Sequence, residues 1–310
     1  KYFLAYLTGQ GTALAADNYF TSFITSDIEP IVMLILFLGA SAFVIFRGVN
    51  KGIESFSKVI MPALLLLVVA IAVFSLTLSH TDSNGATRTG LEGLKVYVIP
   101  NLSGLTVKSF FSTLLDAMGQ LFYSLSIAMG IMIAYGSYVR DDANLNKSIN
   151  QIEIFDTVVA FLAGVMIIPA VYTFSGIEGM DASGPSLMFI SLPKVFAAMG
   201  FVGNIIGCLF FAMVLFAALT SAVSVMEAVV SSLMDNFKLS RVKSASIEGI
   251  IALVVGILVC LGYNIMYFEA SLPNGATGQL LDIMDYVSNN ILMPIVAIGT
   301  CVLIGWIVKP

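Results

Sequence analysis

The chain has 310 residues, of which 58% are hydrophobic and 11% are charged, and its formal net charge is −5. Soluble domains carry about 25% charged residues, so we expect a lipid bilayer, and not water, around most of this chain. The negative charge and the lack of a basic tract exclude a nucleic-acid partner. The three cysteines lie inside apolar runs and indicate neither a disulfide framework nor a metal site.

Both ends of the chain lie in apolar sequence. Lys1 leads directly into YFLAYLTG, without the basic region and cleavage site of a signal peptide, and the last residues read IGWIVKP. We therefore interpret the chain as part of a longer protein, beginning at the outer end of an apolar helix.

Seven segments are apolar and long enough to cross a bilayer, for which a helix needs about 20 residues. They lie near 30–47, 59–79, 111–138, 152–174, 200–234, 248–268 and 288–308. Pro62, Pro169 and Pro294 lie within these segments, and membrane helices tolerate proline better than soluble ones do. The sequence thus predicts an all-α polytopic membrane protein.

The basic loop residues fall mainly on one side of a bundle of seven crossings. That side receives Arg47, Lys51, Lys58, Arg140, Lys147, Lys238, Arg241, Lys243 and Lys309. The other side receives Arg88, Lys95, Lys108 and Lys194. Because short cytoplasmic loops are rich in lysine and arginine, loops 47–58, 139–150 and 235–247 are predicted to be cytoplasmic, in a plasma-membrane protein.

Three loops on the outer side are long. Residues 80–109 and 269–285 carry turn residues, and residues 175–199 contain an amphipathic stretch between Pro185 and Phe196. This stretch predicts a helix near 185–197. We favour a helix that lies over the outer face above one that contacts a substrate.

Polar and flexible residues interrupt the third segment at membrane depth. They are Gln120, Tyr123, Ser124, Ser126 and Gly130. If the helix unwinds around Ser124–Gly130, its carbonyl groups can bind a cation, and N–H groups of the next half-helix can bind a carboxylate. Small residues also let two helices pack closely, and the residues alone favour neither interpretation.

The fifth segment carries a polar face. Ala217, Thr220, Ser221 and Ser224 recur at spacings of three and four, so they share one side of a helix. Their hydroxyl groups and a carbonyl could complete an all-oxygen sodium shell. Serine hydroxyls also bond back to the preceding turn in packed membrane helices, and this packing interpretation is slightly favoured.

Four carboxylates lie within apolar segments or at their edges: Asp156, Glu227, Asp235 and Asp285. Asp156 is the most informative, because a buried carboxylate needs a counter-charge, a proton or a metal ion. Asp235 and Asp285 lie at segment ends, where solvation alone explains them. For Glu227 the sequence suggests only a buried hydrogen-bonding role.

Four blocks resemble, in order and spacing, the neurotransmitter:sodium symporter family, particularly its bacterial sodium-dependent amino-acid transporters. They are RGVNKGIESFSKVIMP (47–62), GQLFYSLSIAMGIMIAYGSYV (119–139), FAALTSAVSVMEAVVSSLMD (216–235) and LLDIMDYVSNNILMP (280–294). The resemblance implies the leucine-transporter-like inverted-repeat fold, with the seven segments as the family's fourth to tenth helices and residues 1–8 as the tail of the third.

On this resemblance, residues 1–110 end the first inverted repeat and residues 111–310 form the second. The first two helices and most of the third are then missing. In the family, the first helix supplies half of the substrate pocket and half of both sodium sites. The chain as given is therefore not expected to transport by itself.

The resemblance also assigns residues to the substrate, the ions and the gates. The substrate positions are Tyr123, Ser124, Ser126, Met129, Ser221 and Val225. The substrate-adjacent sodium is assigned to Ser124 and Asp156, and the second sodium to Ala217, Thr220 and Ser221. The outer gate is assigned to Gln120 and Asp285, and the inner gate to Tyr138 and Asp235.

These assignments imply sodium-coupled symport of a small-molecule L-amino acid by alternating access. Tyr123, Met129 and Val225 carry no charge, so a hydrophobic or aromatic side chain is expected. Asp156 resembles the acid that takes the place of chloride in bacterial members, which predicts chloride independence. The oligomeric state stays open.

Other classes of protein fit less well. The alternative is a non-transporting membrane fragment, a scaffold or a channel-like helical bundle. A channel would require charged rings or a carbonyl filter motif, and neither is present in the sequence. An enzyme is not expected, because the sequence contains no visible nucleophile–base pair or metal-ligand cluster.

Overall fold

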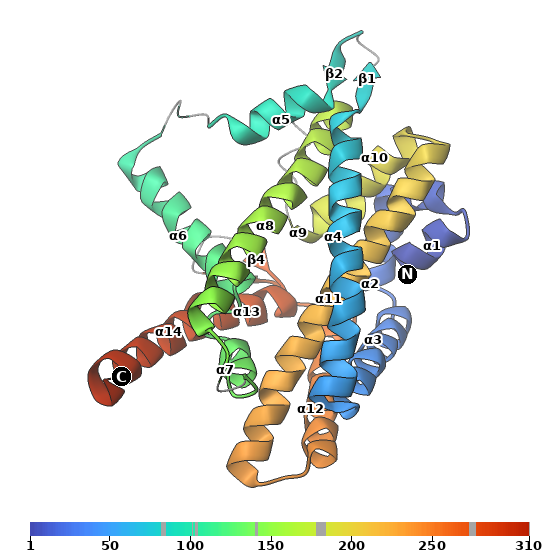
Figure 1. The fold of residues 1–310 in the computed structure, drawn as a ribbon. Helices are drawn as coiled ribbons and strands as arrows, with labels where there is room; N and C mark the ends of the chain where they lie inside the picture. The colour runs from blue at the N-terminus through green and yellow to red at the C-terminus, as the bar shows by residue number, and fades with distance from the viewer. Residues whose placement is uncertain are drawn as a thin grey trace. The chain divides into compact units, whose positions relative to one another are not determined.

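The computed structural model is mainly helical (Figure 1) and describes residues 1–81, 85–100, 102, 105–139, 142–177, 184–272 and 277–309. The chain divides into two compact units, each of which is described by itself. Unit 1 comprises Lys1–Phe23, Ser57–Ser103 and Ile154–Ala218. Unit 2 comprises Ile24–Phe56, Gly104–Glu153 and Leu219–Pro310.

The α-helices follow one another along most of the chain. They are α1 (Tyr2–Leu7), α2 (Asp17–Ile24), α3 (Glu29–Phe46), α4 (Ser55–Leu76), α5 (Gly90–Val98), α6 (Val107–Ser124), α7 (Ile131–Gly136), α8 (Leu145–Ser175), α9 (Gly184–Ser186), α10 (Leu192–Ala198), α11 (Phe201–Phe237), α12 (Arg241–Leu261), α13 (Leu280–Tyr286) and α14 (Met293–Val302). A 3₁₀ turn, η1, covers Gly11–Ala15. Four segments are π-helical: η2 (Val49–Glu54), η4 (Leu187–Ser191), η5 (Val287–Leu292) and η6 (Leu303–Val308).

Within the part of the chain that the structure describes, six helical stretches are long and apolar enough to cross a membrane. They are Glu29–Phe46, Gly52–Leu76, Leu145–Ser175, Phe201–Phe237, Arg241–Leu261 and Leu280–Val308. Six of the seven predicted segments are thus confirmed as long apolar helices. The third, 111–138, is not one continuous helix, because α6 ends at Ser124.

The predicted cytoplasmic loops are shorter than expected. Helix α8 begins inside the predicted loop 139–150, and η2 and the start of α4 occupy much of 47–58. Between α11 and α12 only residues 238–240 are not helical. For this last loop the reason is the length of α11: 37 helical residues span about 55 Å, well beyond a hydrocarbon core of about 30 Å.

Aromatic packing joins the outer-loop helices of unit 1 to α1 and the first half of α11. Tyr6 stacks on Phe211 with ring centroids 5.5 Å apart, and the Tyr2 hydroxyl donates to the Phe189 carbonyl at 2.8 Å. Residues Gly184–Ala198 form a continuous helical run through α9, η4 and α10. The helix predicted near 185–197 is therefore confirmed.

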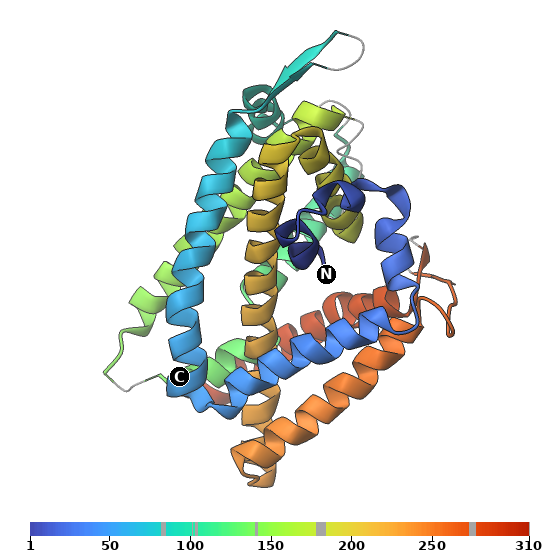
Figure 2. The same ribbon diagram turned by 90° about the vertical axis from the view of Figure 1, so that its right-hand side faces the viewer.

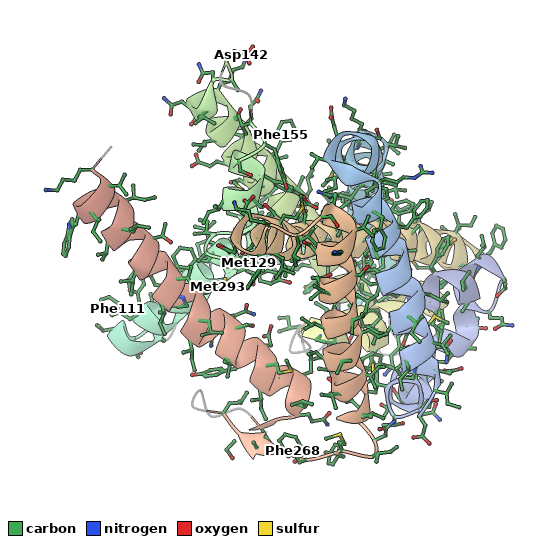
Figure 3. All side chains as sticks on the ribbon, turned by 90° about the horizontal axis from the view of Figure 1, so that it is seen from below. Phe111, Met129, Asp142, Phe155, Phe268 and Met293 are labelled. Atoms are coloured by element: carbon green, nitrogen blue, oxygen red, sulfur yellow. The ribbon has the colours of Figure 1, made fainter. Side chains whose placement is uncertain are left out.

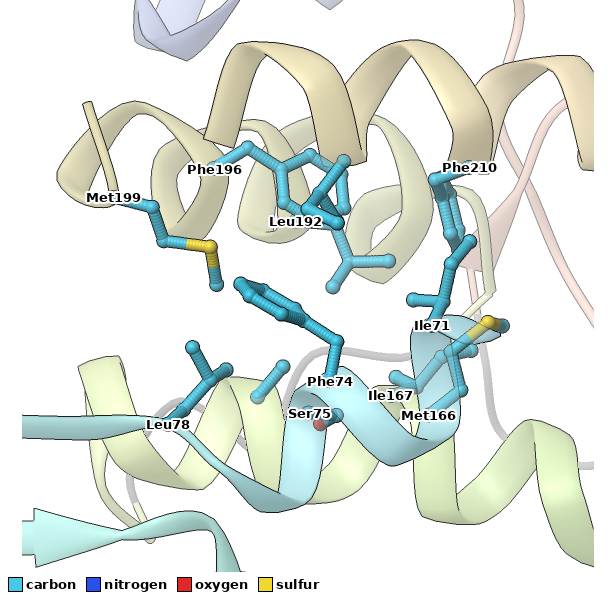
Figure 4. Close-up of a pocket in the computed structure, with 12 residues that line it drawn as sticks. Ile71, Phe74, Ser75, Leu78, Met166, Ile167, Leu192, Phe196, Met199 and Phe210 are labelled. Carbon is cyan, nitrogen blue, oxygen red and sulfur yellow. The ribbon is translucent and has the colours of Figure 1, made fainter. Parts of the chain in front are cut away.

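Helices α4, α8, α10 and α11 of unit 1 also enclose a small apolar cavity of about 10 Å³ (Figure 4). Among the described residues, the buried Ser75 hydroxyl at its edge has no hydrogen-bond partner. The space is about that of one water molecule, but a buried water needs two or more polar partners.

Two short hairpins lie in the predicted outer loops. Strand β1 (Ser79–Thr81) pairs antiparallel with β2 (Thr87–Thr89), and β3 (Ala270–Ser271) pairs with β4 (Thr277–Gly278). The predicted turn at 269–285 lies partly outside the described residues. The His80 ring of β1 stacks on the Phe174 ring with centroids 4.7 Å apart, so the first hairpin packs against the end of α8.

In unit 2, α3 packs along α12, and Figure 2 shows the two helices side by side. Val44 and Ile45 of α3 form an apolar core with Ala245 of α12 and Val230 of α11. This core fixes the second half of α11, which carries the residues of the candidate site.

Candidate functional site

The predicted interruption of the third segment is confirmed. Helix α6 ends at Ser124, and the six residues that follow form turns and bends before α7 begins at Ile131. The Ile127 N–H still bonds to the Phe122 carbonyl at 2.9 Å, and regular helical bonding resumes where the Ala134 N–H bonds to the Gly130 carbonyl. Residues 125–130 are therefore an opened stretch of backbone between two helices.

The backbone of this opened segment is strained. Ser126 and Ala128 have φ values of 55° and 64°, and Gly130 has a φ of 78°. Non-glycine residues rarely adopt the left-handed region, and each costs about 1–3 kcal/mol unless its surroundings hold it there. Such strain is concentrated at functional sites, so the opened segment is the leading candidate for one.

Contacts with α11 hold the second half of the broken helix. The Tyr135 hydroxyl of α7 and the Ser224 hydroxyl of α11 form a hydrogen bond of 2.7 Å. A Cβ atom added at Gly130 would lie 3.9 Å from the Ala228 Cβ. Met129, labelled in Figure 3, belongs to the opened segment. The end of the opened segment thus lies beside a long, regular helix.

The six predicted substrate residues all belong to unit 2. Tyr123, Ser124, Ser126 and Met129 lie at or beside the break, and Ser221 and Val225 lie on α11. Tyr123 is 53% exposed and Val225 is 42% exposed, so unit 2 leaves these side chains open and does not enclose them. Their role in binding a substrate stays a prediction.

The residues predicted for the second sodium lie on one continuous helix. Ala217, Thr220 and Ser221 are three and four residues apart in α11, so they share a face as the spacing requires. Ser224 behaves as the packing interpretation predicts, because its hydroxyl donates to the Thr220 carbonyl at 3.0 Å. The role of Ala217, Thr220 and Ser221 in binding sodium stays a prediction.

The substrate-adjacent sodium was predicted from a residue in each unit. Ser124 ends α6 in unit 2, and Asp156 is a half-buried residue of α8 in unit 1. Ser124 thus lies in the helix predicted from segment 111–138, and Asp156 lies in the helix predicted from segment 152–174. Their pairing stays a prediction.

The predicted outer-gate residues line one hollow of unit 2, with a volume of about 650 Å³. Gln120 and Tyr123 approach it from α6, and Asp285 approaches it from α13. Asn289 of the π-helical segment η5 also lines the hollow, and its Nδ2 donates to Asp285 Oδ1 at 2.6 Å. One carboxylate oxygen of Asp285 is therefore held by an amide that the sequence interpretation missed.

The inner-gate assignment of Tyr138 and Asp235 stays a prediction, and the structure adds a third residue beside Tyr138. The Tyr138 hydroxyl donates to Glu227 Oε1 at 2.7 Å, whereas the predicted neighbour, Asp235, is exposed at the end of α11. Glu227 is fully buried, and Arg241 binds it through Nη1 to Oε1 at 3.0 Å and Nη2 to Oε2 at 2.5 Å. Arg241 Nε also donates to the Ile45 carbonyl at 2.9 Å.

The sequence interpretation therefore missed the ion pair between Glu227 and Arg241. The sequence indicates Arg241 only as a basic residue of a predicted cytoplasmic loop, yet it forms a bidentate ion pair with Glu227. The available signal was weak: a single acid within an apolar helix and the first arginine after it, 14 residues later.

Comparison with known proteins decides the family. The model of the sodium:neurotransmitter symporter family matches residues 21–310. The chain belongs to this family. Its members are sodium-dependent membrane transporters and not enzymes, so the predicted class, the multi-pass plasma-membrane location and the expected absence of an enzyme function are confirmed at the level of the family.

Individual relatives agree with this assignment. A Bacillus subtilis protein named "Uncharacterized sodium-dependent transporter YhdH" is 34% identical over 296 residues, which cover 94% of this chain and 61% of that protein. The sodium- and chloride-dependent taurine transporter of the rat is 29% identical over 274 residues, covering 85% of this chain and 41% of the transporter. The chain thus spans about three fifths of the length of the bacterial relative, and less of the animal one.

A solved structure supports the fold. The crystal structure of MhsT in complex with L-phenylalanine is 33% identical, with a TM-score of 0.81, and the match covers 98% of this chain and 66% of MhsT. The predicted leucine-transporter-like fold is thereby confirmed.

Proposed function

We propose that the full-length protein is a sodium-coupled symporter that moves a hydrophobic or aromatic L-amino acid by alternating access. The opened backbone at residues 125–130 is the observation that carries this proposal. Irregular backbone at membrane depth is tolerated where it lines a cavity, and there its carbonyl and N–H groups can receive ions and a substrate carboxylate. The sodium gradient then drives accumulation, because each unit charge crossing 100 mV contributes about 2.3 kcal/mol.

Sodium is the coupling ion of this proposal. The substrate-adjacent ion would bind to Ser124 and Asp156, and the second ion to Ala217, Thr220 and Ser221. Hydroxyl, carbonyl and carboxylate oxygens suit a hard cation. Residues 1–110 and 111–310 would belong to the two inverted repeats whose relative motion opens the site to one side at a time.

The gates of the proposal lie at two places in unit 2. Gln120 and Asp285 would close the outer hollow. Tyr138 and Asp235 would form the inner gate. The buried ion pair of Glu227 with Arg241 binds Tyr138 and so belongs to the inner network as well.

A hydrophobic or aromatic amino acid is the substrate class that the site favours. Tyr123, Met129 and Val225 offer no charge to pair with a lysine or glutamate side chain. MhsT, a relative of known structure, was crystallised with L-phenylalanine. We expect unlabelled tryptophan, phenylalanine, leucine and methionine to compete for uptake of labelled phenylalanine by the full-length protein in liposomes. Strong competition by lysine or glutamate alone would refute the proposed substrate class.

We also propose that transport is independent of chloride. Two sodium ions and a zwitterionic substrate need negative charge nearby, and the carboxylate of Asp156 would supply it without the desolvation of a bound anion. Uptake should therefore persist when gluconate replaces chloride. An Asp156→Asn variant, which lacks this carboxylate, should take up less substrate than the wild type in gluconate. Collapse of wild-type uptake in gluconate would contradict the proposal.

A further inference from the structure

The π-helical segment η5 places a side-chain amide beside the acid assigned to the outer gate. Asn289 lies four residues after Asp285, and its Nδ2 donates to Asp285 Oδ1 at 2.6 Å. Ser288 Oγ donates to the Asp285 backbone carbonyl at 3.0 Å and lies 3.5 Å from Asn289 Oδ1. An ionised carboxylate can only accept hydrogen bonds, so Asn289 turns its nitrogen, and not its oxygen, toward Asp285.

The amide of Asn289 is the side-chain partner that the structure gives to the Asp285 carboxylate. Asp285 is exposed, and among the described residues its second oxygen, Oδ2, has no hydrogen bond or ion pair. An exposed side chain samples several rotamers, and holding it in one of them has an entropic cost. A hydrogen bond to a charged group is stronger than one between neutral groups, so the half-buried Asn289 can select one orientation of the carboxylate.

Both residues line the hollow of about 650 Å³ that Gln120 and Tyr123 of α6 also line. Helix α6 contacts η5, so the hollow lies where these two segments meet within unit 2. Because a carboxylate oxygen accepts only donors, the group that meets Asp285 when the hollow closes must carry N–H or O–H groups, as the Gln120 amide does. Closure therefore depends on where the carboxylate is held. Departures from regular α-helix to π-helix are frequent at functional sites.

We propose that Asn289 is a positioning residue of the outer gate. Its amide holds Oδ1 of Asp285 and leaves Oδ2 for the donor that closes the hollow over the substrate. Asn289 acts through Asp285 and does not itself touch the substrate. The inference rests on the proposed function, because the gate role of Asp285 belongs to that proposal.

The test is the rate at which labelled L-phenylalanine leaves the full-length protein in sodium buffer, after addition of excess unlabelled L-phenylalanine. A poorly closing gate lets the substrate escape, so dissociation from Asn289→Ala should be about 2–10-fold faster than from the wild type, as expected for the loss of one hydrogen bond. Asp285→Asn should dissociate at least as fast. Adding Asn289→Ala to Asp285→Asn should change nothing further, because the amide acts through the carboxylate.

The control variant is Thr300→Val in the same helical stretch. The Thr300 hydroxyl donates to the Val296 carbonyl at 2.8 Å, so this substitution also removes one local hydrogen bond, but away from the hollow. Its dissociation rate should equal that of the wild type. The number of phenylalanine sites per protein, measured in the same samples, shows whether each variant is folded.

An exchanged protein separates gate positioning from helix stabilisation. Asp285→Asn combined with Asn289→Asp keeps one carboxylate beside one amide, but it moves the carboxylate to position 289. A bond that only stabilises η5 would be restored by the exchange, and dissociation would be slow again. We expect dissociation as fast as from Asp285→Asn, and this comparison remains even if Asn289→Ala does not fold.

Three results would overturn the inference. Wild-type dissociation from Asn289→Ala, or from the exchanged protein, would show that Asn289 does not position the gate, while sodium-dependent binding would still support the proposed function. Wild-type dissociation from Asp285→Asn would remove the gate role of Asp285 and the inference with it. A wild-type protein that binds L-phenylalanine equally with and without sodium would contradict the proposed function itself.

Discussion

Replacing Arg241 by alanine is expected to lower the free energy of unfolding by about 3–5 kcal/mol. Glu227 is fully buried, and the guanidinium group supplies its counter-charge through two hydrogen bonds. Without Arg241 the carboxylate would remain inside the protein with the Tyr138 hydroxyl as its one partner among the described residues. The bond from Arg241 to the Ile45 carbonyl would be lost as well. Denaturation of the purified full-length protein in detergent measures the effect.

Two further variants make this prediction specific. Lys243 lies on the same helix two residues later and is exposed, so Lys243→Ala should change stability by no more than about 0.5 kcal/mol. A double variant with methionine at both Glu227 and Arg241 removes both charges together and should be more stable than Arg241→Ala. Equal stability of Arg241→Ala and Lys243→Ala would show that the ion pair contributes nothing.

Replacing Gly130 by alanine is expected to weaken sodium-dependent substrate binding by about 5–30-fold. Gly130 has a φ of 78°, and an L-residue in this left-handed region costs roughly 1–2 kcal/mol. A Cβ atom would meet the Ala228 Cβ at 3.9 Å, which is ordinary contact, so the effect arises from backbone strain and not from a clash. Equilibrium binding of labelled L-phenylalanine to the full-length protein, with and without sodium, measures it.

Gly136 provides the matched control. Gly136 is the last residue of α7, the short helix that Gly130 precedes, and a Cβ atom there would meet no atom within 4 Å. It has no positive φ, so Gly136→Ala should bind substrate as the wild type does. If Gly130→Ala also bound like the wild type, the left-handed turn at the start of α7 would have no part in the site.

The sequence predicts the broad architecture because burial in lipid constrains composition strongly. A run of about 20 apolar residues has few alternatives to a membrane helix, and six such runs are helices in the structure. The break at Ser124–Gly130 was also predictable, since serine and glycine in place of leucine at membrane depth need a reason. What the residues alone could not decide was whether these positions open the backbone or only pack helices closely.

The Glu227–Arg241 ion pair was not predictable in the same way. It depends on the tight turn between α11 and α12, in which Lys238 has a φ of 53°, and this turn brings the first residue of α12 back toward α11. The sequence shows Arg241 as one more basic residue near a cytoplasmic helix end. Counting charges in loops identifies neither Glu227 as the partner of Arg241 nor the bond from Tyr138 to Glu227.

The partner of Asp285 shows a second limit. Side-chain pairs within one turn, such as Asn289 with Asp285, depend on local backbone geometry, and here the backbone is π-helical. A regular helix and a π-helix place the fourth following residue differently, and the sequence does not distinguish the two.

Hydrogen exchange of the full-length protein tests the central claim most directly, because the opened backbone at residues 125–130 is proposed to receive the ligands. Amide exchange in a peptide covering this segment should slow when sodium and L-phenylalanine are both present, and much less with either alone. Unchanged exchange there, in a preparation that still takes up the amino acid, would contradict the account.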